Sequence, residues 1–278
     1  MRALAEVKAY ADQHKAQVVL TNRARHASEL ASAALADGCE LVVAVGGDGT
    51  MNEVATSLIG TSGILGLIPC GSGDGLGRHL RIHGSVRHAL HVLETGLPRL
   101  IDSGVADGHP FFTAAGMGFE ADIALKFNQL KQRGFLRYLS TSARMLRSYQ
   151  PQRYAVTHAD GCTELRAFTL VVANSDQYGN NAIIAPGARA DDGQLDLCAI
   201  PPITLFNSAS LVARLFTGTI DRHAGVVLRR ATKFTIERDS AGPLHTDGEN
   251  YTAGKTVSFS ILPASLRIMA PRVAHQAI

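Results

Sequence analysis

The chain has 278 residues, of which 46% are hydrophobic and 18% charged, and its formal net charge is +3. This length exceeds that of an ordinary single domain and predicts two domains with real apolar cores. The mild charge excludes a polycation that binds nucleic acid through its whole surface.

The four cysteines, Cys39, Cys70, Cys162 and Cys198, lie far apart and lack the spacing of a metal site. We expect mostly buried free thiols in a reducing compartment. No stretch reaches the roughly 20 apolar residues that a membrane span needs. The first residues also lack a signal-peptide core. The sequence therefore predicts a soluble, cytoplasmic protein.

The first hundred residues alternate between helical and strand patterns, which indicates a parallel sheet with helices packed on its faces. In such sheets ligands bind beyond the carboxyl ends of the strands. Thr21, the loop 46–50 and the loop 69–72 would converge there. The pattern predicts helices over 2–14, 26–35, 51–58 and 86–93, and strands over 17–21, 41–45 and 63–68.

The loop Gly46-Gly47-Asp48-Gly49-Thr50 joins an apolar strand to a helix. Glycines allow the backbone to approach a bulky anion, and the N–H groups at a helix start favour phosphate. A carboxylate beside phosphates makes sense if it holds Mg²⁺ or orients an attacking group. The loop predicts a phosphate site, with a tight turn that binds nothing as the alternative.

The longer segment from Gly46 to Val54 resembles the signature of the diacylglycerol kinase catalytic-domain family, which includes bacterial lipid kinases and sphingosine kinases. Its short Gly-Gly-Asp-Gly core is also similar to NAD kinases and phosphofructokinases. The resemblance covers residues 17 to 270. It implies that ATP is bound by Thr21, Gly46, Gly47, Asp48, Gly49, Thr50, Met51, Asn52, Gly71 and Ser72.

A second glycine-rich loop, Pro69 to Arg78, resembles the second nucleotide loop of this family. Its Gly-Ser-Gly form is closer to the sphingosine kinase branch. Asp74 stands where the family usually has Asn, and a carboxylate cannot donate the hydrogen bond that an amide can. Asp74 either binds metal or turns outward, and an ordinary connecting loop is the alternative for the whole segment.

Residues 123–153 carry seven basic and no acidic side chains, with apolar residues at roughly helical spacing. This pattern predicts a basic amphipathic helix. It favours peripheral contact with an anionic membrane surface as strongly as a solvated helix face. The family resemblance favours the membrane, because its substrates lie in bilayers.

From Tyr154 onward the pattern becomes strands without helices between them, which indicates a β-sandwich. The segment 111–119 resembles the family segment that opens the second domain, and a strand ending at a glycine turn fits it equally. We expect a nucleotide-binding domain over 1–101, a sandwich over 102–265 and a tail over 266–278 that could return to the first domain. Strands are predicted over 154–157, 165–173, 195–200, 234–237 and 256–262.

The segment from Ile184 to Asp196 follows a long family pattern, and its Asp-Asp-Gly turn offers hard oxygen ligands. The resemblance implies a structural Mg²⁺ bound by the Asp192 side chain and by the carbonyls of Arg189 and Gln194. A hairpin turn without an ion is the alternative. Asn180-Asn181 replaces small family glycines, a change that nothing in the sequence explains.

His245-Thr246-Asp247-Gly248-Glu249 is the third chemical element. In an extended chain residues two apart share a face, so both carboxylates would be presented together. The resemblance implies the catalytic Asp-Gly-Glu of the family, with Glu249 as proton acceptor. A surface turn is the alternative.

Together these segments predict an NAD-kinase-like Rossmannoid α/β domain followed by a β-sandwich domain, with the active site in the cleft between them. We expect a kinase that transfers the γ-phosphoryl group of ATP, with Mg²⁺, to diacylglycerol, giving phosphatidic acid. The catalytic residues would be Glu249, Asp48 and Asp247. Sphingoid bases or other lipids are alternative substrates, and a catalytically impaired nucleotide- or lipid-binding relative is the other alternative. A homodimer is allowed.

Family members begin with a strand and an Asn-Pro glycine loop before their first helix, whereas residues 1–14 already have the pattern of that helix. We therefore expect the first strand to be missing from this chain, with the true start upstream. Its loss would leave backbone groups of neighbouring strands unpaired.

Overall fold

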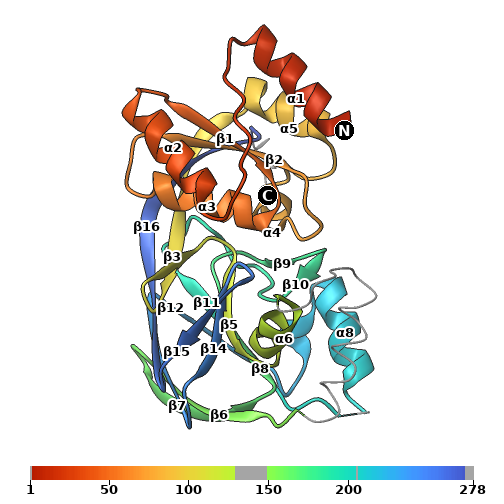
Figure 1. Cartoon of the computed structure of the whole chain (residues 1–278). Helices are drawn as coiled ribbons and strands as arrows, with labels where there is room; N and C mark the ends of the chain where they lie inside the picture. Colours follow the sequence, from red (N-terminus) through yellow and green to blue (C-terminus); the bar gives the residue numbers. More distant parts are fainter. Residues whose placement is uncertain (1, 129–148, 205, 273–278) are drawn as a thin grey trace. The chain divides into compact units, whose positions relative to one another are not determined.

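The computed structural model describes residues 2–128, 149–204 and 206–272 (Figure 1). The chain divides into two compact units. The first comprises Met1–Asp102 and Pro263–Ile278, and the second comprises Ser103–Leu262. Two long strands, β3 (Leu97–Ala106) and β16 (Thr256–Ala270), each contribute residues to both units.

The first unit is an α/β domain built on parallel pairing. Strand β1 (Leu41–Gly46) pairs with β2 (Ile64–Pro69), and β2 pairs in parallel with the end of β16 at Arg267 and Ile268. Four of the five described helices of this unit agree with the predicted ones, whereas the fourth forms inside the predicted second glycine loop. The five helices are α1 (Arg2–Gln13), α2 (His26–Ala36), α3 (Asp48–Leu58), the short α4 (Gly75–His79) and α5 (Val86–Thr95).

Apolar residues at helical spacing fix α3 against the sheet. Met51, Val54, Ala55 and Leu58 are buried, and α3 contacts both β1 and β2. Because β2 packs against helices as well, its residues 65 to 68 are all buried. An uninterrupted apolar run is what a parallel strand covered on both faces requires. This packing fixes where β1 and β2 end, and so positions the glycine loops.

The strand predicted over 17–21 does not form. The residues have no regular structure, and the side chain of Leu20 is 63% exposed. Among the described residues β1 pairs only with β2, so no strand lies beside 17–21 to accept its hydrogen bonds. A single extended segment has no ladder to stabilise it, so the prediction was wrong.

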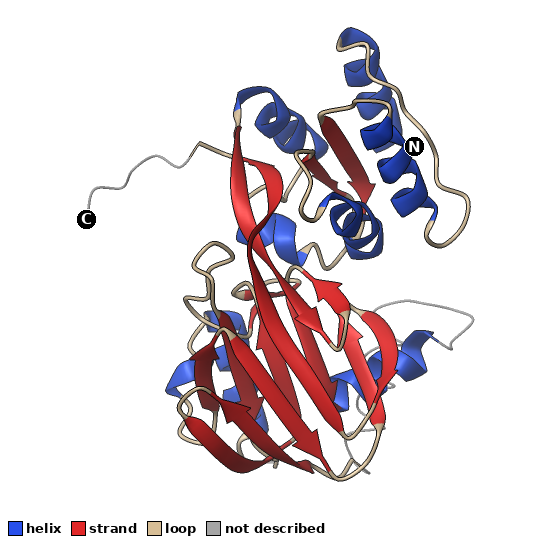
Figure 2. Ribbon diagram, turned by 90° about the vertical axis from the view of Figure 1, so that its left-hand side faces the viewer, coloured by secondary structure: helices blue, strands red, loops and turns tan. Residues whose placement is uncertain are grey.

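The second unit is a β-sandwich, as predicted, and Figure 2 shows its strands as stacked layers. One sheet has the order β12-β11-β8-β5-β14-β15. The other contains the start of β16 with β13, β6, β7, β3 and β4. The bounds are β4 (His109–Phe111), β5 (Ala114–Gly118), β6 (Gln152–His158), β7 (Gly161–Ala167), β8 (Thr169–Ala173), β11 (Leu195–Ile200), β12 (Val227–Ala231), β13 (Lys233–Arg238), β14 (Gly242–Thr246) and β15 (Glu249–Ala253).

The sandwich core lies between the two sheets, where Met117, Leu170 and Leu197 from one sheet meet Phe234 and Phe259 from the other. A second apolar cluster lies on the opposite face of the first sheet. There α8 (Ser208–Thr217) inserts its buried Leu211. The pair β9 (Gln177–Gly179) and β10 (Ala182–Ile183) completes the unit beside α6 (Phe119–Asn128) and a short 3₁₀ turn (Ile220–Arg222).

One predicted strand of this unit and the prediction that most cysteines are buried need correction. The run 165–173 is two strands, because the backbone of Phe168 leaves the ladder: its N–H donates to Ile200 and its carbonyl accepts from Phe119. Only Cys198 among the four free cysteines is buried.

The predicted basic helix over 123–153 lies largely outside the described residues. Among the described helices, none is long and apolar enough to cross a membrane.

Candidate functional site

The first glycine loop presents unused backbone donors at the start of α3. The first hydrogen bond within this helix runs from the Met51 N–H to the Gly47 carbonyl, at 3.1 Å. The N–H groups of Asp48, Gly49 and Thr50 therefore have no acceptor in the helix, as expected for a first helical turn. They lie at the positive end of the helix dipole, where an anion is favoured.

The two glycine loops touch each other backbone to backbone. A Cβ on Gly71 would lie 2.8 Å from Cα of Gly47, so the second loop could not carry a side chain there without moving. The Cys70 N–H donates to the Gly46 carbonyl at 2.8 Å and fixes the register of the two loops. A Cβ on Gly46 would meet the Thr50 side chain at 2.9 Å. Close approach therefore requires glycine at positions 46 and 71.

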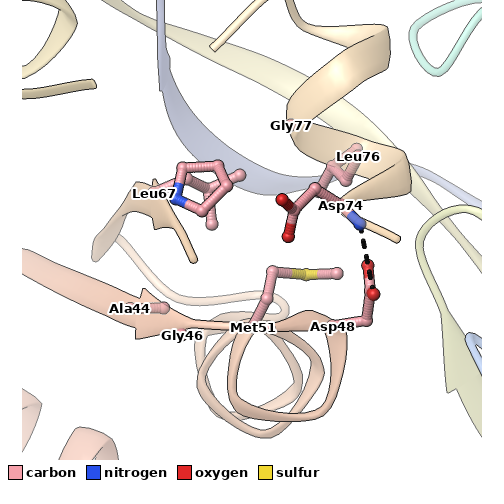
Figure 3. A pocket seen from close by; sticks show the side chains of 10 residues that line it. Ala44, Gly46, Asp48, Met51, Leu67, Asp74, Leu76 and Gly77 are labelled. Carbon is pink, nitrogen blue, oxygen red and sulfur yellow. Dashed lines mark hydrogen bonds between the residues drawn. The ribbon is translucent and has the colours of Figure 1, made fainter. Parts of the chain in front are cut away.

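Two carboxylates meet where the loops touch (Figure 3). Asp48 accepts the N–H groups of Asp74 and Gly75, both at 3.2 Å. Asp74 accepts the Gly71 N–H at 3.2 Å, so the alternative in which it turns outward is wrong. Burial, and then the nearby Asp48, raise the pKa of Asp74 above its ordinary value. The charge of the nearby Arg78 opposes this shift in the pKa of Asp74. The loops thus hold two carboxylates together, and the Asp48 carboxylate accepts backbone N–H groups.

A small pocket opens beside these carboxylates, with apolar walls and one polar side. Ser72 is exposed, and neither it nor Thr21, which is also exposed, belongs to the lining. Asn52 lies one helical turn from Thr56, whose hydroxyl contacts its amide oxygen at 3.4 Å. The lining residues are Ala44, Gly46, Gly47, Asp48, Met51, Leu67, Pro69, Asp74, Leu76 and Gly77.

Glu53, which follows Asn52 in α3, has a role that the sequence pattern did not reveal. Its carboxylate accepts the N–H groups of Arg25 and Ala27, at 2.8 and 3.0 Å, and so caps the start of α2. A carboxylate at a helix start satisfies otherwise unused donors. Glu53 therefore holds α2 against α3, and its side chain is committed to the fold.

The Asp-Gly-Glu segment of the second unit is a tight hairpin between β14 and β15, so the predicted extended chain is wrong. Thr246 pairs with Glu249, which leaves a two-residue turn. Asp247 has φ 47° and Gly248 has φ 86°. Such positive φ values at both turn residues match the right-handed twist of a hairpin, and Asp-Gly adopts them readily. Asp247 therefore lies within the turn, whereas Glu249 lies at the start of β15.

Asp247 is engaged with the backbone, whereas Glu249 is exposed. One Asp247 oxygen accepts the N–H groups of Thr113 and Ala114, at 2.9 and 3.1 Å, and the other accepts that of Phe112 at 2.8 Å. Three such bonds satisfy a carboxylate without any metal. Asp247 therefore positions the hairpin, and Glu249 is the carboxylate at this turn with room to react.

The base of the same hairpin is held by a buried arginine that the sequence analysis missed. Arg238 is 6% exposed and donates to four backbone carbonyls at 2.8 to 3.0 Å, those of Gly242, Pro243, Ala253 and Gly254. Burial lowers its pKa below the ordinary value. Charged side chains thus fix the hairpin at both ends, with Glu249 between them.

A polar cluster on the outer face of this sheet was also missed. The His245 ring Nε2 lies 3.1 Å from both the Glu120 carboxylate and the Tyr178 hydroxyl, and Tyr178 also donates to Glu120. A side chain on Gly116 would collide with Glu120. The cluster ties α6 and β9 to β14. Its members are distant in sequence, so no local pattern could have revealed it.

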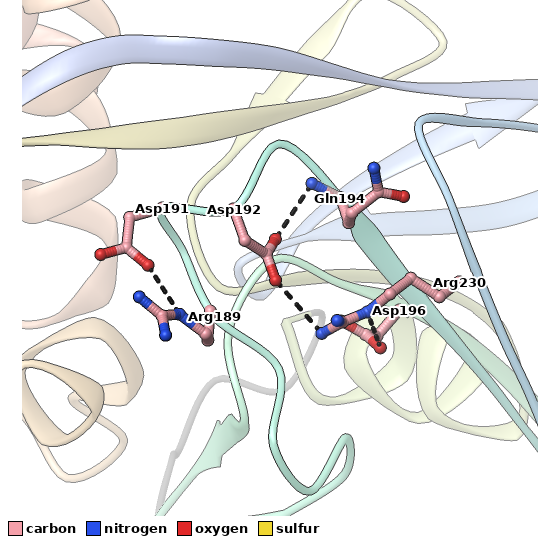
Figure 4. Close-up of polar contacts among 6 residues, drawn as sticks. All are labelled: Arg189, Asp191, Asp192, Gln194, Asp196 and Arg230. Atoms are coloured by element: carbon pink, nitrogen blue, oxygen red, sulfur yellow. Dashed lines mark hydrogen bonds and ion pairs between the residues drawn. The ribbon is translucent and has the colours of Figure 1, made fainter.

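The Asp192 side chain, one of the three predicted Mg²⁺ ligands, already has protein donors at both of its oxygens (Figure 4). Asp192 uses one oxygen to accept the Gln194 N–H at 3.1 Å, and the other lies 3.3 Å from the Arg230 guanidinium. Arg189 pairs with Asp191 at 3.0 Å. Within the described ranges, no three His, Cys, Asp or Glu side chains group as metal ligands. The oxygens of Asp192 are already occupied by donors.

Two glycine loops on parallel strands, followed by a sandwich with an acidic hairpin, define a two-domain protein of the NAD-kinase type of fold. Two family models divide the chain. The diacylglycerol kinase catalytic domain matches residues 2–106, and the YegS C-terminal NAD kinase beta sandwich-like domain matches residues 113–270. A probable YegS-like lipid kinase of Pseudomonas fluorescens is 30% identical over 96% of this chain and 91% of its own. The chain therefore belongs to the family of YegS-like lipid kinases, in which the diacylglycerol kinase catalytic domain precedes this sandwich domain, as its sequence signature predicted.

Relatives and solved structures agree with this assignment. A diacylglycerol kinase of Mycobacterium tuberculosis is 27% identical over 90% of this chain and 82% of its own. An uncharacterized Synechocystis protein is 26% identical over 84% of this chain, which spans only 56% of that relative. A Bacillus anthracis diacylglycerol kinase has a TM-score of 0.70 at 16% identity, covering 92% of this chain and 85% of its own. An Archaeoglobus fulgidus NAD kinase, solved in complex with ATP, has a TM-score of 0.56 at 12% identity, with 97% and 90% covered.

Proposed function

We propose that the chain is a lipid kinase that transfers the γ-phosphoryl group of ATP to diacylglycerol. The observation that carries this proposal is the pair of glycine loops, where free N–H groups adjoin the carboxylates of Asp48 and Asp74. N–H groups suit phosphate, whereas carboxylates repel it, so the combination favours a phosphate that arrives with a cation. Mg-ATP has that chemistry.

The loops would bind the phosphates and stabilise the negative charge that develops on them during transfer. The first-turn N–H groups of α3 donate to phosphate oxygens, and the closely packed glycines let the nucleotide reach the backbone. Mg²⁺, when bound with ATP, would neutralise phosphate charge beside Asp48 and Asp74. Phosphoryl transfer depends mainly on such positioning and electrostatics.

Glu249 is proposed as the proton acceptor. The lipid hydroxyl oxygen forms a bond to the γ-phosphorus while the bond from that phosphorus to the β,γ-bridging oxygen breaks, and the hydroxyl proton goes to the Glu249 carboxylate. Glu249 is exposed, whereas Asp247 is engaged in three hydrogen bonds. A base needs an accessible, unengaged oxygen, so Asp247 is proposed to act through the position of the hairpin.

Diacylglycerol is proposed as the acceptor because the family model and the Mycobacterium relative carry that name. Sphingoid bases remain the alternative, which the Gly-Ser-Gly form of the second loop favours. Peripheral attachment to anionic bilayers through 123–153, cytoplasmic location and homodimer formation stay predictions from the sequence.

Radiolabel transfer from ATP to diacylglycerol, sphingosine, ceramide and monoacylglycerol tests the proposal. We expect phosphatidic acid as the main product. Glu249→Gln keeps the size of the side chain but removes its basicity, so turnover should fall by about 10²–10⁴-fold. Affinity for ATP should change little. If only sphingosine is labelled, sphingosine replaces diacylglycerol as the proposed acceptor. If Glu249→Gln keeps wild-type turnover, Glu249 is not the base.

A further inference from the structure

The Asp-Asp-Gly turn of the second unit ends at β11, and an arginine from β12 lies directly against it. In the antiparallel pair β11 and β12, Asp196 is opposite Arg230. Residues that face each other across two strands have side chains on the same side of the sheet and within reach of each other. The register of these strands therefore brings a guanidinium to the turn.

One guanidinium contacts the Asp192 carboxylate of the turn and the Asp196 carboxylate of β11 (Figure 4). Nε and Nη2 of Arg230 donate to the two oxygens of Asp196, at 3.1 and 3.2 Å. Nη2 also lies 3.3 Å from Oδ2 of Asp192. The planar fork of an arginine suits such a bidentate contact, and its charge is permanent.

The remaining oxygen of Asp192 is satisfied by the chain itself, because Oδ1 accepts the Gln194 N–H at 3.1 Å. The side chains of Asp192 and Asp196 are only 21% and 20% exposed, so their charge is poorly solvated and needs a partner. A divalent ion at Asp192 would have to displace these donors and would be repelled by Arg230 at close range.

We propose that Arg230 supplies the positive charge of this turn, so that the second unit folds without a metal ion at Asp192. Arg230 links the turn to β12 in the way that a bridging ion would link two carboxylates. The proposal concerns folding and does not depend on the lipid kinase activity. It replaces the metal site that the family pattern implied for Arg189, Asp192 and Gln194.

Thermal unfolding of the full chain without nucleotide tests this proposal, because no Mg²⁺ then enters with ATP. Wild-type Tm should be the same within about 1 °C in EDTA, in 5 mM Mg²⁺ and in 5 mM Ca²⁺. Arg230→Gln should lower Tm by about 2–4 °C, the shift typical of losing one partly buried ion-pair network in a chain of this size.

Arg229→Gln is the matched control, since Arg229 is the neighbouring residue of β12 and, within the described part of the chain, bonds only the carbonyl of Leu228, at 2.7 Å. Its Tm should equal that of the wild type. Equal Tm values for Arg230→Gln and Arg229→Gln would overturn the proposal. So would a wild-type Tm that falls in EDTA and recovers with Mg²⁺, if Asp192→Asn removes that response.

Discussion

Asp48 in the first unit and Asp192 in the second both belong to Asp-Gly sequences that the family pattern connects with a cation, yet the fold treats them differently. Asp192 lies 3.3 Å from Arg230, which also pairs with Asp196. Among the residues that the structure describes, Asp48 accepts only the backbone N–H groups of Asp74 and Gly75, and it lies beside a second carboxylate.

This difference indicates which of the two aspartates, Asp48 or Asp192, needs a cation from outside the chain. Where the chain supplies an arginine, the negative charge is balanced and the site contributes to folding. Asp48 and Asp74 are two neighbouring carboxylates held by backbone N–H groups, with Arg78 as the basic side chain that acts on Asp74, so negative charge is left over. Burial raises the pKa of Asp74. A motif match alone could not distinguish these cases, whereas the partners of each carboxylate do.

The largest expected effect is the difference in turnover between two variants in which Asp48 or Asp192 is neutralised. Asp48→Asn should lower turnover by at least about 10²-fold and weaken Mg-ATP binding, because a charge beside the phosphates is lost. Asp192→Asn should keep turnover within about 2-fold and lose only stability. Steady-state kinetics on both purified variants checks this. If Asp192→Asn stays folded and loses activity as Asp48→Asn does, the distinction fails.

The next effect concerns Asp247, a third carboxylate, which the chain satisfies with three N–H groups. Asp247→Asn keeps one accepting oxygen but puts an amide where the Phe112 N–H donates. We expect a loss of about 2 kcal/mol in the free energy of unfolding, measured by denaturant titration. Glu249→Gln on the same hairpin should unfold as the wild type does, and similar losses in both variants would contradict this role for Asp247.

A smaller effect should follow from crowding Asp48 without removing its charge. A Cβ on Gly73 would lie 2.5 Å from Oδ2 of Asp48, so Gly73→Ala must move that carboxylate. We expect KM for Mg-ATP to rise by about tenfold, which corresponds to roughly 1.4 kcal/mol of binding. Gly254→Ala is the control, because its Cβ would meet nothing nearer than 3.8 Å. An unchanged KM in Gly73→Ala would mean that the Asp48 position matters little.

The smallest effect tests whether Asp74 shares the cation with Asp48. Asn tolerates the positive φ of 47° found at this position and can still accept the Gly71 N–H. Asp74→Asn should therefore keep the loop and weaken Mg-ATP binding by about 3-fold, with little change for metal-free ATP. Calorimetry with and without Mg²⁺ measures both. Equal losses in the two titrations would assign Asp74 to the nucleotide rather than to its cation.

The parts of the fold that the sequence predicted depend on local patterns. Continuous apolar runs with glycine turns located β1, β2 and the two loops, because a buried parallel strand needs such runs. The prediction over 17–21 failed because a strand also needs a neighbour. The break at Phe168 was missed because it depends on backbone bonds to Phe119 and Ile200.

The candidate site was predictable only as far as its residues lie close together in the sequence. The two glycine loops lie at the predicted positions, whereas the acidic segment, predicted as an extended chain, is a tight turn. The partners that decide their chemistry are distant: Arg230 is 34 residues from Asp196, and Asp247 is 133 to 135 residues from the N–H groups that it accepts. No sequence periodicity reveals such long-range contacts. The sequence therefore indicated candidate carboxylates, but it did not indicate which of them already have hydrogen-bond or ion-pair partners in the fold.

Binding of Mn²⁺, followed by electron paramagnetic resonance with and without a non-hydrolysable ATP analogue, tests the central contrast most directly. We predict no tight Mn²⁺ on the protein alone and one Mn²⁺ when the analogue is present. That Mn²⁺ should be lost in Asp48→Asn and kept in Asp192→Asn. Mn²⁺ bound tightly without nucleotide and lost in Asp192→Asn would contradict the account, as would nucleotide-dependent Mn²⁺ that Asp48→Asn retains.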